Sequence, residues 1–300
     1  MERYYSFNRY LKSIFGSRVH RIGINAGFSC PNIDGTLSDD GCSYCNNKAF
    51  GVYVRCDAEI KKQIEESISF YKQRMGVNQF IAYFQSFSNT YADLDRLKQA
   101  YNVVRSFPEI AGICISTRPD CVDEDKIRMI SQYKKDYLVW IEYGLQTTSN
   151  KMLRAINRNH TYEDFLFSLN LTRKYKINAG VHMILGLPKA THQDMMTDCH
   201  NLAKLDLQGI KFHVLHVSKN TSLEKAYNKG EVRLMTEAEY ISVVCDFLEC
   251  LPPTIAILRL ASTAFKDYLI APSWTSNKSV VIEGIRRELV KRNTHQGCKL

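Results

Sequence analysis

Short apolar runs alternate with longer amphipathic stretches along most of this chain. The apolar runs have the length of strands and lie at residues 19–26, 79–85, 111–116, 137–143, 178–184 and 209–215. The amphipathic stretches have helical spacing and lie at residues 57–74, 92–106, 122–134, 149–175, 191–205 and 236–250. Such alternation is typical of repeated strand-helix units that build a parallel sheet. The pattern therefore predicts an α/β fold.

The same pattern leaves the shape of the sheet open. Periodicity does not distinguish a closed barrel from an open barrel or a doubly wound sheet. Residues 251–300 add one more apolar run, TIAILRLA, and one basic helical stretch, VVIEGIRRELVKR. We therefore predict a basic, aromatic N-terminal segment at 1–18, a core at 19–225 and a C-terminal extension at 226–300.

Composition narrows the class of protein. The chain has 300 residues, of which 45% are hydrophobic and 24% charged, so it can bury a large core. No apolar run approaches the length of about 18 residues that a membrane-spanning helix needs, and the start MERYYSFNRY has no signal-like apolar segment. Most of the ten cysteines stand singly in apolar surroundings. We expect a cytoplasmic protein with reduced thiols.

The net charge of +9 is concentrated at the two ends of the chain. Residues 1–21 and residues 278–300 each carry an excess of four positive charges. Near the N-terminus the basic residues alternate with aromatic ones. These rings and charges can contact the bases and phosphates of RNA, or they can belong to an amphipathic helix that docks the N-terminus. The sequence leaves both interpretations open.

Cys30, Cys42 and Cys45 carry the most informative spacing, Cys-x11-Cys-x2-Cys, directly after an apolar run. A cubane iron-sulfur cluster that is fully ligated by protein uses four cysteines. Three cysteines leave one iron open to a substrate or cofactor, as catalytic metal sites keep one open position. Zinc is the alternative, but it would have to recruit Cys56 or His20 at irregular spacing.

The segment CPNIDGTLSDDGCSYCNNKAF resembles the cysteine loop of a bacterial radical S-adenosylmethionine (SAM) family related to the catalytic subunit of Elongator. Further similar segments follow in the family's order: FQSFSNTY, STRPDC, EYGLQT, GVHMILGLP and KFHVLHVSKNTSLE. The resemblance spans roughly residues 20–225. It implies a partial (β/α)6 TIM-like barrel with a small C-terminal α/β extension. It also implies a 4Fe-4S cluster on Cys30, Cys42 and Cys45, with SAM on the fourth iron.

The resemblance also implies which residues contact SAM, all near the C-terminal ends of strands, where barrel enzymes gather their chemistry. These residues are Tyr44, Gln85, Ser86, Ser116, Arg118, Glu142, Gln146 and Arg158. Tyr44 would lie against the adenine, and Gln85 and Ser86 would bind the amino group. Arg158, twelve residues beyond Gln146, has the family's spacing for an arginine that meets the methionyl carboxylate.

Several of these residues have a structural alternative. Ser116 stands where the Elongator-type motif has an acid, so a ribose contact does not carry over directly. Arg118 can grip a carboxylate of the ligand or form an ion pair with Asp120 or Asp123. Glu142 can bind ribose hydroxyls or satisfy a buried neighbour, because a charged residue inside a sheet needs a partner. His182, His213 and His216 can face the barrel interior, where histidines are more often hydrogen-bonded core residues.

The activity that the resemblance implies is radical chemistry. An electron from a flavodoxin or ferredoxin-type reductant enters the cluster, and cleavage of SAM gives a 5'-deoxyadenosyl radical that abstracts hydrogen. The Elongator relatives act on the wobble uridine of tRNA. We therefore predict tRNA as partner and the conversion of 5-carboxymethylaminomethyl-2-thiouridine to 5-aminomethyl-2-thiouridine. The alternatives are a radical SAM enzyme acting on a small metabolite or peptide, and a zinc-bearing RNA-binding protein.

Overall fold

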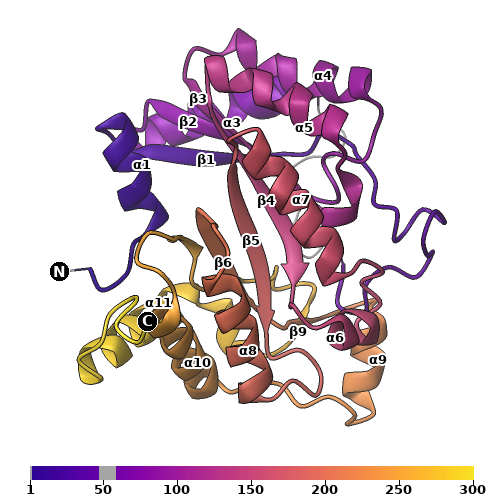
Figure 1. Cartoon of the computed structure of the whole chain (residues 1–300), viewed down its shortest axis with the longest axis vertical. Helices are drawn as coiled ribbons and strands as arrows, with labels where there is room; N and C mark the ends of the chain where they lie inside the picture. Colours follow the sequence, from indigo (N-terminus) through magenta and orange to yellow (C-terminus); the bar gives the residue numbers. More distant parts are fainter. Residues whose placement is uncertain (1, 47–58) are drawn as a thin grey trace.

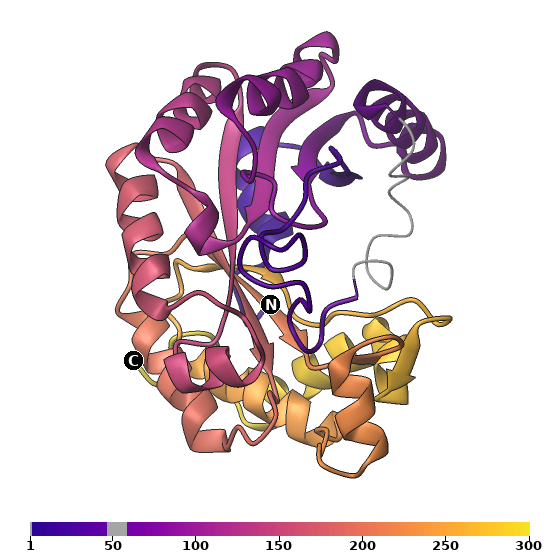
Figure 2. The ribbon, with the colours of Figure 1, turned by 90° about the vertical axis from the view of Figure 1, so that its right-hand side faces the viewer.

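The computed structural model describes residues 2–46 and 59–300, and its centre is a parallel sheet (Figure 1). In the described part of the chain this sheet has seven strands in the order β1-β2-β3-β4-β5-β6-β8. Their bounds are β1 (Val19–Ile24), β2 (Gln79–Phe84), β3 (Ile110–Thr117), β4 (Leu138–Gln146), β5 (Asn178–Leu185), β6 (Gly209–Val214) and β8 (Ala256–Arg259). The sheet curls into a half-barrel (Figure 2), which confirms the predicted partial TIM-like barrel.

Helices cover the outer face of this sheet (Figure 2). They are α3 (Ile60–Met75), α4 (Leu94–Asn102), α5 (Glu124–Ser131), α7 (Tyr162–Lys174), α8 (His192–Ala203) and α10 (Glu237–Cys250). The short helix α6 (Asn150–Ala155) instead lies at the end of β4, where Met152 packs with Tyr44. Short 3-10 helices lie at Val103–Ser106, Pro119–Cys121, Gln132–Lys135 and Ser273–Ser276. Thr161, Thr191 and Thr236 begin α7, α8 and α10 with capping boxes, in which threonine and an acidic residue satisfy free backbone amides.

Two predicted elements differ in the structure. The helical stretch predicted at 149–175 is two helices, α6 and α7, because Asn157 and Asn159 adopt left-handed backbone angles (φ 52° and 55°) that a helix cannot contain. The apolar run that we placed in the C-terminal extension becomes β8 and pairs in parallel with β6. The sheet therefore has one strand more than the six predicted. The boundary near residue 225 stays a prediction.

The rest of the C-terminal region packs beside the barrel. A second, antiparallel sheet joins β7 (Val217–Ser218) to β9 (Leu269–Ala271). The helix α9 (Ser222–Asn228) follows β7, and α11 (Lys278–Lys291) packs against α10. None of the described helices is both long and apolar enough to span a membrane.

The N-terminal helix α1 (Phe7–Phe15) closes the barrel at the N-terminal ends of the strands. Phe7 is buried, and its ring stands edge-on to Trp140 at a centroid distance of 5.3 Å. Arg3 Nη1 donates a hydrogen bond to the Thr294 carbonyl (2.8 Å). The aromatic residues of this segment therefore pack onto the barrel, as the second interpretation of the sequence proposed.

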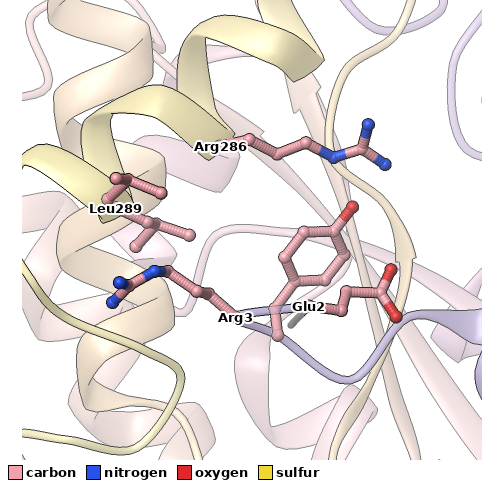
Figure 3. A pocket seen from close by; sticks show the side chains of 6 residues that line it. Glu2, Arg3, Arg286 and Leu289 are labelled. Atoms are coloured by element: carbon pink, nitrogen blue, oxygen red, sulfur yellow. The ribbon is translucent and has the colours of Figure 1, made fainter.

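These contacts bring the two basic ends of the chain together. A pocket between them is lined by Glu2, Arg3, Tyr4, Arg286, Leu289 and Val290 (Figure 3). In Figure 1 both termini lie on the left, whereas the loop after β1, which carries the cysteines, runs on the right. The two regions of concentrated positive charge therefore share one end of the barrel, and the cysteines occupy the other.

Candidate functional site

The cysteine loop follows β1 and folds through short turns at the C-terminal edge of the sheet. Cys30 and Cys42 are buried, and Cys45 is half-buried. The Cys45 amide donates to the Cys42 carbonyl (2.9 Å), which closes one turn. Gly41 adopts φ 72°, and a Cβ added there would lie 3.0 Å from Ile33 Cγ2. Glycine therefore allows the tight turn that brings Cys42 close to the sheet.

Two donors point at the sulfur of Cys42. Asn32 Nδ2 and Arg158 Nη1 each lie 3.4 Å from Cys42 Sγ. Burial and the neighbouring Cys42 raise the pKa of the Cys45 thiol to about 12, although the charge of Arg158 opposes this. Thiols of this kind ionise when they bind a metal, and donors to the sulfur stabilise the thiolate and tune the metal.

The donor set favours an iron-sulfur cluster over zinc. Three cysteine thiolates can bind three irons of a cubane and leave the fourth open, whereas a structural zinc site needs a fourth ligand on the same ion. Of the extra ligands that zinc would need, His20 packs its ring on Tyr71 at 4.0 Å and Cys56 lies outside the described residues.

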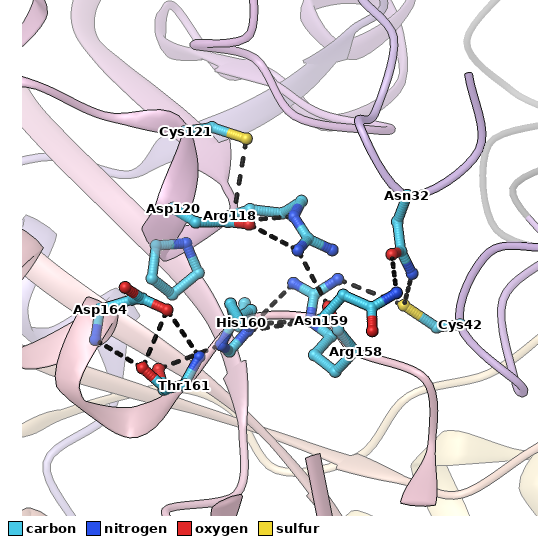
Figure 4. Close-up of polar contacts among 12 residues, drawn as sticks. Asn32, Cys42, Arg118, Asp120, Cys121, Arg158, Asn159, His160, Thr161 and Asp164 are labelled. Atoms are coloured by element: carbon cyan, nitrogen blue, oxygen red, sulfur yellow. Dashed lines mark hydrogen bonds and ion pairs between the residues drawn. The ribbon is translucent and has the colours of Figure 1, made fainter. Parts of the chain in front are cut away.

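Arg118 and Arg158 meet beside the cysteine loop (Figure 4). Arg118 forms the predicted ion pair with Asp120 through Nε and Nη2 (2.9 and 2.7 Å), and Nη2 also donates to the Arg158 carbonyl (2.9 Å). Its Nη1 is buried and has no partner among the described residues. Two adjacent guanidinium groups and an unused charged donor fit an anion such as a carboxylate, since leaving a buried donor unpaired is costly.

Hydrogen bonds to β4 and to His160 hold the Arg158 side chain in place. Its Nη2 donates to the Gly144 carbonyl (2.7 Å), and its Nε donates to His160 Nε2 (3.1 Å). Burial and the charge of Arg158 lower the pKa of His160 to about 3, so the ring is neutral and accepts this hydrogen bond. A Cβ on Gly144 would lie 2.8 Å from Arg158 Nη2 and 2.9 Å from Gln146 Nε2. Glycine at 144 therefore makes room for both predicted side chains.

The loop that carries Arg158 also clamps the cysteine loop, through residues that the sequence analysis missed. Asn157 Nδ2 donates to the Gly41 carbonyl (2.6 Å), and Asn159 Nδ2 donates to Asn32 Oδ1 (2.7 Å). Asn32 Nδ2 in turn donates to the Asn157 carbonyl (2.7 Å). The available signal was the pair of asparagines flanking Arg158, because asparagine tolerates left-handed backbone better than most residues.

The remaining predicted residues lie at neighbouring strand ends. Asn89 Nδ2 joins the loops after β2 and β3 by donating to the carbonyls of Ser86 and Ser116 (both 2.9 Å). The side chains of Gln85, Ser86 and Ser116 form no hydrogen bond with another described residue, so their polar groups are available to a ligand. Tyr44 packs in an apolar cluster with Ile156, Ile184, Leu187 and Leu223.

Glu142 lies apart from this group, deeper in the barrel. Its Oε1 accepts from Arg21 Nη1 (2.7 Å) and Cys114 Sγ (3.2 Å). Its Oε2 interacts with Tyr83, His182 and Lys211 at 2.9, 2.6 and 2.9 Å. Burial alone would raise the pKa of Glu142, but the charges of Lys211 and Arg21 hold it well below its usual value. We call Glu142 and these five partners the Glu142 cluster.

The structure thus realises the buried-neighbour alternative for Glu142. Both of its oxygens already have partners, and they are not directed at Arg118 or Arg158. A part for Glu142 in cofactor binding stays a prediction.

Comparison with protein families gives two matches. Residues 38–202 match the model of the radical SAM superfamily, and residues 207–291 match the model of the Radical_SAM C-terminal domain. Protein YtqA of Bacillus subtilis (strain 168) is 34% identical over 298 residues, which cover 99% of this chain and 92% of that protein. Protein YhcC of Escherichia coli (strain K12) is 30% identical over 265 residues, which cover 88% and 85%.

More distant similarities also occur. A tRNA uridine(34) acetyltransferase of Dehalococcoides mccartyi (strain CBDB1) is 22% identical over 195 residues, which cover 63% of this chain and 40% of that protein. Among solved structures, archaeal Methanocaldococcus infernus Elp3 lacking residues 1–46 superposes with a TM-score of 0.65 at 16% identity, covering 93% of this chain and 64% of that one. At this identity the structural likeness establishes the fold alone.

Proposed function

Because this chain belongs to the radical SAM superfamily, we propose that it uses radical chemistry to modify the wobble uridine of tRNA. Members of the superfamily are enzymes that use a 4Fe-4S cluster and SAM. When bound, these cofactors supply a 5'-deoxyadenosyl radical that abstracts a hydrogen atom from the substrate. The residues of the chain would bind and orient the cofactors and the substrate, and they would exclude water from the radical.

The residues of the cysteine end suit these tasks. Cys30, Cys42 and Cys45 would hold the cluster. One observation supports a SAM site beside these cysteines. Arg118 Nη1 is unused and lies next to Arg158, and Arg158 itself contacts Cys42. One carboxylate on the methionyl part of SAM would satisfy both arginines.

Other groups suit the remaining parts of SAM. Gln85 and Ser86 offer acceptors for its amino group, and Ser116 offers a hydroxyl for the ribose. Tyr44, in its apolar cluster, offers a ring to the adenine. Gln146, whose amide lies beside Arg158, would help to position the methionyl group.

For the substrate we propose tRNA whose wobble uridine carries a 5-carboxymethylaminomethyl group, with oxidative removal of the carboxymethyl group to leave 5-aminomethyl-2-thiouridine. Hydrogen would be abstracted at the methylene of that group or at a neighbouring carbon. For the methylene, transfer of a second electron from the substrate radical to a one-electron acceptor such as the oxidised cluster would give an imine. Hydrolysis of the imine by water would leave the aminomethyl group and release the two carbon atoms as glyoxylate. The similarity to a tRNA uridine(34) acetyltransferase supports a uridine at this position. The net charge of +9 supports a nucleic-acid partner.

The contacts with tRNA would come from elements that touch the cysteine loop. The Ser43 amide donates to the Ile156 carbonyl directly after α6, and the Leu223 amide on α9 donates to the Ser43 carbonyl (both 2.9 Å). The exposed basic residues on these elements and beside them are Lys151, Arg154, Lys219, Lys225 and Lys229. We call them the rim lysines and arginine, and we propose that they bind phosphates.

The test is anaerobic reconstitution with iron and sulfide, followed by dithionite, SAM and tRNA bearing the wobble modification. We expect 5'-deoxyadenosine together with a changed wobble nucleoside after digestion. Cys42→Ala should lose both, whereas Cys298→Ala, at an exposed cysteine, should keep both. In the cytoplasm a flavodoxin or ferredoxin-type protein would replace dithionite.

Two results would contradict this proposal. Cleavage of SAM without any change in the nucleoside would remove tRNA as substrate and indicate a small metabolite or peptide. Absence of a cluster and of cleavage, with zinc bound instead, would return the chain to the class of zinc-bearing RNA-binding proteins.

A further inference from the structure

The barrel interior is layered along β4, where alternate side chains face inward about 6.6 Å apart. Trp140 lies at the closed end against Phe7 of α1. Glu142 comes next, and Gly144 lies against Arg158 at the cysteine end. The Glu142 cluster therefore occupies a middle layer of the barrel, between the rings of Phe7 and Trp140 and the proposed cofactor site.

This middle layer holds more positive than negative charge. Glu142 is its carboxylate, and it is shared by Arg21 and Lys211. Arg259 adds a third cation, because a shift in the β6–β8 register pairs it with Lys211 on the same face. In the described chain the guanidinium of Arg259 has neither a hydrogen bond nor an ion pair. Unpaired charge inside a protein is costly unless a partner is supplied.

A histidine adds a second unused group. His213 lies two residues after Lys211 on β6, so both side chains face the interior. Its Nε2 is buried and has no partner among the described residues, and its ring lies 5.4 Å from that of His182. His213 and Arg259 keep part of their surface exposed, whereas the side chain of Lys211 is 2% exposed. A ligand entering the barrel would therefore meet His213 and Arg259 first.

We propose that Arg259 and His213, backed by Lys211, bind a carboxylate of the substrate inside the barrel. A planar guanidinium can pair with a carboxylate through two parallel hydrogen bonds. One such anion would offset part of the excess charge and give His213 a partner. The proposal rests on the proposed function and identifies the part of the modified uridine that is recognised.

The same charge would separate substrate from product. The carboxymethylaminomethyl group carries a carboxylate that the middle layer attracts. The aminomethyl group of the product carries only a positive charge, which the excess of cations repels. Attraction of one and repulsion of the other together give specificity, and the repulsion favours release of the product.

The experiment measures binding of two anticodon stem-loop RNAs to the reconstituted protein with SAM. One RNA carries 5-carboxymethylaminomethyluridine and the other 5-methylaminomethyluridine, which lacks the carboxylate. We expect the wild-type protein to bind the first about tenfold more tightly, the typical effect of a hydrogen bond to a charged group. Arg259→Gln should remove this preference, and Arg259→Lys should restore part of it. His213→Gln should weaken the preference independently.

A control variant keeps the result specific. Arg287→Gln, at an exposed arginine on α11, should keep the full preference. Equal binding of the two RNAs by the wild-type protein, or a preference that survives in Arg259→Gln and His213→Gln, would overturn the proposal.

A second measurement separates this proposal from the choice of tRNA. Acetate, compared with chloride at equal ionic strength, should raise the melting temperature of the wild-type holoprotein but not that of Arg259→Gln. An acetate effect that depends on Arg259, without any activity on tRNA, would sustain the carboxylate receptor and reject tRNA as substrate. Modification of the wobble nucleoside, without an acetate effect and without a preference between the two RNAs, would support tRNA as substrate and reject the carboxylate receptor.

Discussion

The two ends of the half-barrel differ in how completely their groups are satisfied. At the cysteine end, Arg118 keeps a buried donor without a described partner, next to the second guanidinium of Arg158. At the closed end, Phe7 packs edge-on against Trp140, and Arg3 is bonded to a backbone carbonyl. The chain concentrates its excess positive charge at the closed end, where the buried Trp140 Nε1 also has no partner among the described residues. Of the two ends as described, only the cysteine end sets an unused charged donor beside a second guanidinium. That pairing therefore marks the reactive end better than net charge does.

The largest effect on stability should come from the closed end. Phe7→Ala removes a buried ring, and we expect a loss of about 3 kcal/mol in the free energy of unfolding, measured by denaturant titration. Phe70→Ala, at a ring that is 51% exposed, should cost far less. Cleavage of SAM per folded molecule should be unchanged by Phe7→Ala. A loss of cleavage as large as the loss of stability would show that the two ends are not separate in function.

The largest effect on SAM use should come from the cysteine end. Arg158→Ala removes a charged donor to the proposed carboxylate and to Cys42, and we expect the efficiency of SAM cleavage to fall about 100-fold. The matched control is Arg154→Ala, an exposed arginine on the preceding helix. Steady-state kinetics of 5'-deoxyadenosine formation measure both. An unchanged KM for SAM in Arg158→Ala would remove Arg158 from the cofactor site.

The middle layer should give a pH dependence. Burial lowers the pKa of Lys211 to about 7, so its charge is lost as pH rises through that value. Affinity for the carboxylate-bearing RNA should therefore weaken by about tenfold between about pH 6 and pH 9. The control RNA without the carboxylate should show no such change, and Lys211→Gln should flatten the curve.

The neighbours of Lys211 do not titrate in this range. The charged and titratable groups that face it are Arg21, Tyr83, Cys114, Glu142, His182, His213 and Arg259. The pKa values of both histidines are lowered and those of the tyrosine and thiol are raised. Folding also lowers the pKa of Lys211, so its contribution to stability rises with pH between about 7 and 10.5. An affinity for the carboxylate-bearing RNA that rises with pH would contradict the predicted role of the Lys211 charge.

The smallest effect should separate the two basic regions. Lys151→Gln combined with Lys225→Gln removes two rim charges, and we expect the slope of log affinity for tRNA against log salt to fall by about 1.5. Arg3→Gln combined with Arg287→Gln removes two charges at the closed end and should leave the slope unchanged. Filter binding at several salt concentrations measures both. The opposite outcome would place the tRNA on the closed end.

The sequence predicted the repeated architecture and the cysteines because both depend on local pattern and spacing. It missed the joining of β8 to the sheet because strand pairing depends on register, which periodicity does not contain. It left open whether Glu142 binds the cofactor or satisfies a buried neighbour, and it did not identify Arg21 and Lys211, which meet Glu142 from distant strands. It did not single out Arg259 for the same reason. The partners of a buried polar side chain come from strands far apart in sequence, so the sequence pattern alone does not identify them.

The hydrogen bond from Arg3 to Thr294 joins residues that are 291 positions apart. A ribosome therefore makes the N-terminal helix long before it makes the segment that anchors it. Trp140 can cover part of the aromatic surface of α1 once β4 is made, but Ala256 and Leu258 of β8, which complete this cluster, come near the end of the chain. Contacts over such sequence distances are slow to form, and exposed apolar surface invites aggregation. The closed end of the barrel is thus expected to be completed late during synthesis, and chaperones are expected to act on this end of the nascent chain.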